Sequence, residues 1–378
     1  MSDRIRRREF LARTSKAVIA SSVLPIAGCV TRRTPSLSPA PSHDRLLGPL
    51  VYALDDQIPK WMRDANVPGL SISIIDEAKL AWRRGFGVKD AASRAPVTDE
   101  TVFEAASMSK PVFAYVVMKL CDGGTINLDT PLSRYTSERF LDGDPRLDLI
   151  TARHVLSHTA GFQNWRSEKE PLRIHFTPGE KFLYSGEGYN YLQTVVTSLL
   201  RQPFETSMQA RLFGPLAMTS SSYVWSDTVA KRMARPHDAS GRPLDNKKST
   251  PADVARYGSA GALLTTPTDY TKFVISIIEP DRADAFHLTP DSLREMLRPH
   301  IRIDGGRYPA SWALGWQVFH NANRDFIYHG GDNEGFHCAA VASVAGKSGF
   351  VAMTNGENGP SVLSSLLTHS LMQEFLAS

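Results

Sequence analysis

The order of strand-like and helix-like segments is the feature that most constrains how this chain folds. Apolar or alternating runs typical of strands occur near both ends, at 69–75, 79–87, 312–319, 325–329, 335–344 and 349–354. Helical spacing dominates elsewhere, at 46–66, 107–122, 188–201, 267–278, 289–298 and 360–376. This order predicts an α/β (α+β) domain with one sheet built from both ends of the chain and a helical lobe inserted between them.

The start of the chain carries its charge surplus. Residues 1–28 hold six basic and two acidic side chains, and this surplus equals the formal net charge of +4 of the whole chain. The remaining residues are therefore formally neutral and give no electrostatic footprint for nucleic acid. We expect no nucleic-acid partner.

The same segment resembles a bacterial export signal. Arg7-Arg8 followed by Phe10-Leu11 is similar to the twin-arginine pattern. An apolar run of about 12 residues follows, shorter than the roughly 20 residues that a transmembrane helix needs. The alternative is a soluble basic tail.

The end of this run is similar to a lipidation site. Ile26-Ala27-Gly28-Cys29 resembles a lipobox, in which the cysteine is lipidated and becomes the mature N-terminus. Ordinary cleavage beside an unrelated cysteine is the alternative. We therefore expect an export signal at 1–28, a Pro/Ser-rich tether at 29–45 and a catalytic domain at 46–378. The expected location is the periplasm or cell envelope, with a lipid anchor on Cys29 in the membrane.

Two cysteines remain in the body of the chain. Export would permit a disulfide between Cys121 and Cys338. Both lie in apolar segments, which favours buried free thiols. No cysteine–histidine cluster has metal-ligand spacing, and no metal or cofactor is implied.

The motif that carries chemistry is Ser107-Met108-Ser109-Lys110, which is predicted to open a helix. Residues three apart share a helix face, so the Ser107 hydroxyl lies within reach of the Lys110 amine. A lysine acts as a base only when burial and neighbours lower its pKa, and the very apolar residues 112–118 indicate a buried helix. Because about one or two such matches arise by chance in a chain of this size, this motif alone decides nothing.

Three further stretches follow in chain order. They are Leu156-Ser157-His158-Thr159-Ala160-Gly161-Phe162, residues 178–189 around Tyr184-Ser185-Gly186, and Tyr328-His329-Gly330-Gly331-Asp332-Asn333-Glu334-Gly335-Phe336. Together with Ser107 and Lys110 they closely resemble the serine β-lactamase and penicillin-binding-protein-like family, which groups class C β-lactamases, D-alanyl carboxypeptidases and family VIII esterases. The resemblance covers about residues 50–375. It implies an antiparallel sheet flanked by helices, with a cleft beside the helical lobe.

The resemblance also assigns roles. Ser107 would be the nucleophile, Lys110 its base, and Tyr184 the relay that passes a proton to the leaving group. The family's Tyr-x-Asn asparagine, which in β-lactamases holds the amide side chain of the substrate, falls on Gly186. His158 is interpreted as structural.

The family's third motif, Lys-Thr-Gly, has two candidates. Lys347-Ser348-Gly349 matches by letters but follows a turn-like segment, whereas His329-Gly330-Gly331 ends a strand-like run and has the expected sequel, so we choose His329. By resemblance, the backbone N–H groups of Ser107 and Asp332 would form the oxyanion hole. Gly330 and Gly331 would let substrate approach the strand closely.

These features predict a serine hydrolase that acts through an acyl-enzyme on a small ester, amide or peptide. A missing side chain at 186 and a histidine in place of a permanent charge at 329 count against a β-lactamase. We rank an esterase or general serine hydrolase first, a D-Ala or D-amino-acid peptidase second and a β-lactamase third. A Ser-His-Asp triad is disfavoured because the sequence contains no Gly-x-Ser-x-Gly elbow. From another class, a non-catalytic penicillin-binding-type envelope sensor is the alternative. The oligomeric state stays open.

Overall fold

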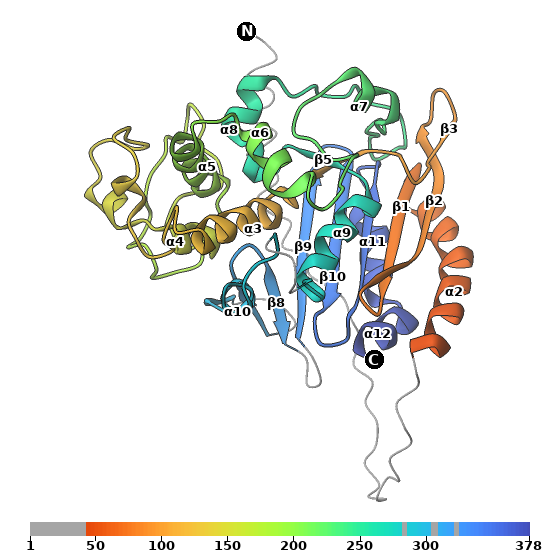
Figure 1. Cartoon of the computed structure of the whole chain (residues 1–378). Coiled ribbons are helices and arrows are strands. Elements are labelled where there is room, and N and C mark those ends of the chain that lie inside the picture. The colour runs from red at the N-terminus through yellow and green to blue at the C-terminus, as the bar shows by residue number, and fades with distance from the viewer. Residues whose placement is uncertain (1–42, 282–285, 304–308, 321–324) are drawn as a thin grey trace, which may run out of the picture.

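A large antiparallel sheet organises the molecule (Figure 1). The computed structural model describes residues 43–281, 286–303, 309–320 and 325–378. In these residues the strand order is β3-β2-β1-β11-β10-β9-β8-β7-β6. The strands are β1 (Gly69–Asp76), β2 (Lys79–Asp90), β3 (Ala95–Pro96), β6 (Ile301–Ile303), β7 (Ala310–Trp312), β8 (Gln317–His320), β9 (Asp325–Asn333), β10 (Phe336–Ser343) and β11 (Ser348–Thr354).

The two ends of the chain meet inside this sheet. β1 pairs with β11 in a register that places Leu70 opposite Thr354 and Ile75 opposite Gly349. The prediction of one sheet built from both ends is therefore confirmed. Since β1, β10 and β11 are buried along their whole length, neither face of the central sheet is open to solvent there.

Each face of the sheet packs against its own set of helices. Along β1, Leu70, Ile72 and Ile74 point into a core shared with α2 (His43–Asp64), α11 (Gly359–Thr368) and α12 (Ser370–Ala377). Ile75 belongs to the other core, which includes α9 (Pro267–Ile278). Period-two alternation of side chains explains this division, and Figure 1 shows α9 crossing in front of the strands.

The inserted lobe lies between β4 (Phe103–Ala106) and β6. β4 pairs with β5 (Leu263–Thr265) in a separate two-stranded sheet. The helices of this stretch are α3 (Ser109–Asp122), α4 (Ala152–Leu156), α5 (Gly186–Leu200), α6 (Phe204–Met208), α7 (Asp227–Arg232), α8 (Pro251–Gly261), α9 and α10 (Pro290–Leu297), with short turns of other helix types at Leu132–Arg134, Pro145–Leu149 and Gln209–Phe213. Residues 109–118 of α3 are all buried, so this helix is the central one.

Two expected elements are each divided. The strand predicted at 312–319 is two strands, because Gly315 turns the chain at φ +88°, where a Cβ would lie 2.6 Å from the Ala114 side chain. The helix predicted at 360–376 breaks at His369, whose backbone is extended. Both breaks lie where local backbone geometry overrides a continuous apolar pattern.

The remaining expectations divide by where they lie. Cys121 and Cys338 are free thiols, and Cys338 is buried. The described residues begin at 43, with α2 as their first element. The predicted export signal, Cys29 and nearly all of the predicted tether therefore lie outside them. Within the described ranges, no helix is both long and apolar enough to cross a bilayer.

Candidate active site

Ser107 sits on a tight turn between β4 and α3. The structure starts the helix at Ser109, two residues later than the sequence pattern suggested, and such boundary differences are common. Ala106 has φ +47°, a left-handed conformation that a non-glycine residue rarely adopts. The turn is held by the Ser109 hydroxyl, which donates to the Ala106 carbonyl at 2.6 Å. Backbone strain of this kind persists where the surrounding structure enforces it. The strained turn leaves Ser107 partly exposed just before a buried helix.

Lys110 lies directly below Ser107. Its Nζ donates to the Ser107 Oγ at 3.1 Å and to the Ala260 carbonyl at 2.6 Å, and the side chain is fully buried. Burial lowers the pKa of Lys110 to about 7, because the apolar surroundings disfavour the charged amine. Lys110 is thus about half neutral near pH 7, and the neutral amine is the state that a base requires.

Tyr184 reaches the same serine from the loop before α5. Its hydroxyl interacts with the Ser107 side chain, and its ring centroid lies 4.8 Å from the Lys110 Nζ. Burial raises the pKa of Tyr184 well above its ordinary value, although the interaction with Ser107 opposes the shift. The phenol therefore stays protonated at neutral pH and can pass a proton but not act as a phenolate.

His158 fixes the position of Tyr184. Its carbonyl accepts from the Leu183 N–H at 2.8 Å and its Nδ1 accepts from the Ser185 N–H at 3.1 Å, one on each side of Tyr184. The imidazole also packs against the Tyr184 ring, with centroids 4.2 Å apart. Because Nδ1 is an acceptor, the proton sits on Nε2, and burial lowers the pKa of His158 well below its ordinary value. His158 therefore positions Tyr184, in agreement with its interpretation as structural.

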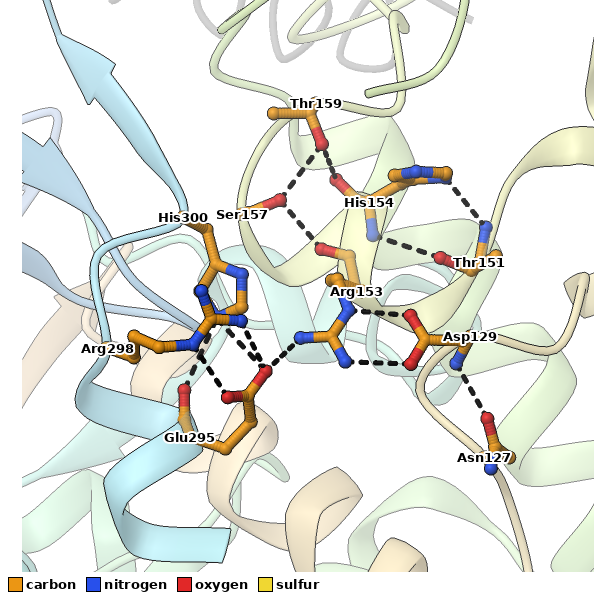
Figure 2. Close-up of polar contacts among 10 residues, drawn as sticks. All are labelled: Asn127, Asp129, Thr151, Arg153, His154, Ser157, Thr159, Glu295, Arg298 and His300. Carbon is orange, nitrogen blue, oxygen red and sulfur yellow. Dashed lines mark hydrogen bonds and ion pairs between the residues drawn. The ribbon is translucent and has the colours of Figure 1, made fainter. Parts of the chain in front are cut away.

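A polar network holds the His158 loop from below (Figure 2). The Arg153 guanidinium binds both oxygens of Asp129, at 2.6 and 2.8 Å, and also pairs with Glu295 on α10. The Ser157 hydroxyl donates to the Arg153 carbonyl at 2.7 Å and contacts the Thr159 hydroxyl at 2.9 Å. Bidentate Arg–carboxylate pairs add geometric precision as well as energy. The network therefore ties α4 and the loop at 157–159 to two other segments.

β9 passes the nucleophile with one edge open. Among the described residues, β8 pairs with β9 only as far as Tyr328, so 329–333 lacks a partner on that side. A two-residue turn joins Asn333 to Phe336, which makes this pair the hydrogen-bonded one and the Asp332–His337 pair the non-bonded one. The Asp332 N–H consequently points to the open edge, as an oxyanion donor must.

Gly331 lets Ser107 lie against this strand. A Cβ there would stand 2.3 Å from the Ala105 carbonyl oxygen and 3.1 Å from the Ser107 nitrogen. The space is thus filled by the chain's own turn, and the two expected oxyanion donors are neighbours. At Gly330 a Cβ would instead meet the Tyr328 hydroxyl at 2.6 Å, on the other face of the strand.

His329 lies in the aromatic cluster that includes the rings of His158 and Tyr184, and it is neutral. Its Nδ1 contacts the Gly330 carbonyl at 2.7 Å, which requires a proton on Nδ1 and leaves Nε2 as a buried acceptor with no hydrogen-bond partner among the described residues. Burial, with the Lys110 charge, lowers the pKa of His329 to about 3. The histidine therefore supplies no positive charge for an anionic substrate.

The other candidate for the third motif lies elsewhere. Lys347 turns the chain from β10 to β11 with φ +53° and pairs with Glu279. This turn joins Ser343 to Ser348, at the opposite end of β10 from the Asp332–His337 pair. The turn expected at 344–346 is confirmed, and it includes Lys347.

Gly186 has no room for a side chain. A Cβ there would stand 2.4 Å from the Trp165 indole. Glu187, the next residue, is buried and binds Arg166 at 2.7 Å, so it is not free to contact a substrate.

Sequence reasoning missed two of these groups. The Ala260 carbonyl that binds Lys110 belongs to the backbone of α8 and leaves no mark in a residue pattern. Trp165 lies in no motif of its own, and only the missing side chain at Gly186 pointed to that place.

Comparisons with known proteins agree with this arrangement. The family model described as Beta-lactamase matches residues 54–368. Protein flp of Staphylococcus aureus (strain N315) is 22% identical over 337 residues, which cover 82% of this chain and 64% of that protein. Esterase EstB of Burkholderia gladioli is 27% identical over 227 residues, covering 52% of this chain and 57% of EstB. The chain thus spans less than two thirds of either relative.

A solved structure shows the same fold. The β-lactamase/D-alanine carboxypeptidase from Pseudomonas syringae superposes with a TM-score of 0.71 at 21% identity, covering 84% of this chain and 99% of that one. The predicted β-lactamase/transpeptidase-like architecture is confirmed. The family match extends over most of the described residues and spans every motif that meets at Ser107. The chain belongs to the Beta-lactamase family, a group of serine hydrolases that includes esterases, β-lactamases and carboxypeptidases.

Proposed function

We propose that this protein is a carboxylesterase that hydrolyses small neutral esters through an acyl-enzyme on Ser107. The observation that carries the proposal is the Ser107 hydroxyl held between the buried Lys110 amine, at 3.1 Å, and the Tyr184 hydroxyl. A nucleophile with a base in hydrogen-bond reach and a third group beside both is the arrangement that covalent catalysis needs. It favours an enzyme over a non-catalytic sensor.

The reaction proceeds in two halves. The Ser107 Oγ attacks the ester carbonyl carbon while Lys110 takes the serine proton, and the backbone N–H groups of Ser107 and Asp332 stabilise the oxyanion. Collapse breaks the bond to the alcohol, which receives the proton from Lys110 through the Tyr184 hydroxyl. Water then attacks the acyl-serine and gives its proton to Lys110. The bond between the acyl carbon and the Ser107 Oγ breaks, Lys110 returns the proton to Oγ, and the acid is released.

The charges around Ser107 favour a neutral ester over a β-lactam. His329 is neutral, and the nearby Asp332 carboxylate, which is paired with His337 at 2.7 Å, adds negative charge. Gly186 offers no amide-binding side chain. Each lost contact costs roughly 1–3 kcal/mol of transition-state binding, so two losses correspond to roughly 10–10⁴-fold in kcat/KM.

A substrate panel tests this proposal. We expect kcat/KM for p-nitrophenyl butyrate to exceed that for nitrocefin by at least roughly 10-fold. Acyl-D-Ala-D-Ala peptides serve as the peptidase control and should be poorer substrates than the ester. A nitrocefin value equal to or above the ester value would return the protein to the β-lactamases, and efficient release of D-alanine would make it a peptidase.

Export and anchoring are a second part of the proposal. The Ile26-Ala27-Gly28-Cys29 sequence supports lipidation of Cys29, and several acyl chains at about 0.8 kcal/mol per buried CH₂ anchor a protein firmly. Native protein should enter the detergent phase on Triton X-114 partition, and Cys29→Ser should stay in the aqueous phase or remain unprocessed. Recovery of wild-type protein from the aqueous periplasmic fraction would support export but contradict the lipid anchor.

A further inference from the structure

The Trp165 indole occupies the place where a side chain at the start of α5 would hang. Its ring atoms stand 2.4–2.7 Å from the Cβ position of Gly186. Gly186 is two residues from Tyr184, whose hydroxyl interacts with Ser107. This is the position at which the family pattern places the asparagine for the acyl side of the substrate. An aromatic ring therefore replaces an amide there.

Hydrogen bonds to the N-terminus of α5 hold the residues on both sides of Trp165. The Gly186 N–H donates to the Asn164 Oδ1 at 2.8 Å, and the Glu187 N–H donates to the Asn164 carbonyl at 3.0 Å. On the other side of Trp165, Arg166 forms a two-pronged pair with the buried Glu187 carboxylate. Bonds on both sides of the tryptophan leave its backbone little freedom.

A second aromatic ring extends the surface from α8. Tyr257 meets Trp165 edge to face, with centroids 5.8 Å apart and an interplanar angle of 78°. Tyr257 lies three residues before Ala260, whose carbonyl binds the Lys110 amine, on the same helix α8. Both rings are only partly buried. Helix α8, whose Ala260 carbonyl binds Lys110, and the loop at 164–166, which is bonded to the start of α5, thus together present a half-exposed aromatic pair.

We propose that Trp165 and Tyr257 form the acyl-binding surface of this enzyme and select esters with a flat aromatic acyl group. The inference rests on the proposed esterase function and names its substrate class. An aryl acyl group gains apolar contact and edge-to-face packing on this pair. An acylamino group, by contrast, would find no hydrogen-bonding side chain at Gly186 and would bury its amide unpaired.

Two esters with one leaving group test the inference. Wild-type enzyme should show kcat/KM for p-nitrophenyl phenylacetate at least roughly 10-fold above that for p-nitrophenyl acetate. Trp165→Ala should lower this ratio several-fold or more, and Trp165→Phe should keep most of it. The matched control is Trp225→Ala, another partly buried tryptophan of the helical lobe, which should leave the ratio unchanged.

Each outcome decides the matter. If Trp165→Ala lowers kcat/KM equally for both esters, the aromatic surface does not bind the acyl group. The same conclusion follows if kcat/KM of the wild-type enzyme is no higher for the phenylacetate than for the acetate. Should Trp165→Ala fail to fold in thermal melting, the partly exposed Tyr257→Ala variant carries the test, with a partial loss of the ratio expected and an unchanged ratio overturning the inference. If wild-type enzyme hydrolyses neither ester, the proposed function is wrong and the inference falls with it.

Discussion

Replacing Ser107 with alanine should abolish covalent labelling by a fluorophosphonate and lower kcat for p-nitrophenyl esters by on the order of 10⁴-fold or more. The next serine along the chain, Ser109, is not placed to act instead. Ser109 is fully buried and is occupied on both sides, donating to the Ala106 carbonyl and accepting from the Leu263 N–H at 3.0 Å. Mass spectrometry of the labelled wild-type protein should therefore place the adduct on Ser107.

The variant itself should fold normally. The Ser107 hydroxyl contacts Lys110 and Tyr184 at a partly exposed position, so its loss opens no cavity in the core. Thermal melting of Ser107→Ala within a few degrees of wild type is the control for this prediction. An adduct on a different serine, or labelling that survives in a folded Ser107→Ala variant, would contradict the assignment of the nucleophile.

The sequence was most informative where chain order and apolar runs act together. β1 and β11 are strongly apolar and lie at opposite ends of the chain, and a buried sheet is the arrangement that satisfies both. Short elements escaped this reasoning. β4, β5 and β6 have three or four residues each, too few for a period of two to stand out from chance.

The same distinction holds for the site. Ser107 and Lys110 were predictable because both lie on one short stretch, where the spacing alone brings their side chains within reach. Trp165 and Ala260 were not, since tertiary packing alone brings them to the site from other segments. The neutral state of His329 was expected from its ordinary pKa, but the burial that lowers this pKa to about 3 is a property of the fold.

The activity should rise with pH through about 7 and then level off. Burial lowers the pKa of Lys110 to about 7, so below this pH the amine is protonated and cannot accept the serine proton. The pKa of Tyr184 is raised and that of His329 is about 3, so neither adds a limb near neutral pH. A profile of log kcat/KM against pH for p-nitrophenyl acetate measures this limb. A flat profile between pH 5 and 9 would exclude Lys110 as the base.

Loss of Lys110 and loss of Tyr184 should not multiply. Lys110→Ala and Tyr184→Phe should each lower kcat by on the order of 10³-fold or more, because each breaks one proton path between Ser107 and the leaving group. Once that path is broken the second change has little left to remove, so the double variant should resemble the worse single variant. Both residues contact the same Ser107 hydroxyl, which is the condition under which such coupling is expected. Two losses that multiply in the double variant would mean that lysine and tyrosine act in separate steps.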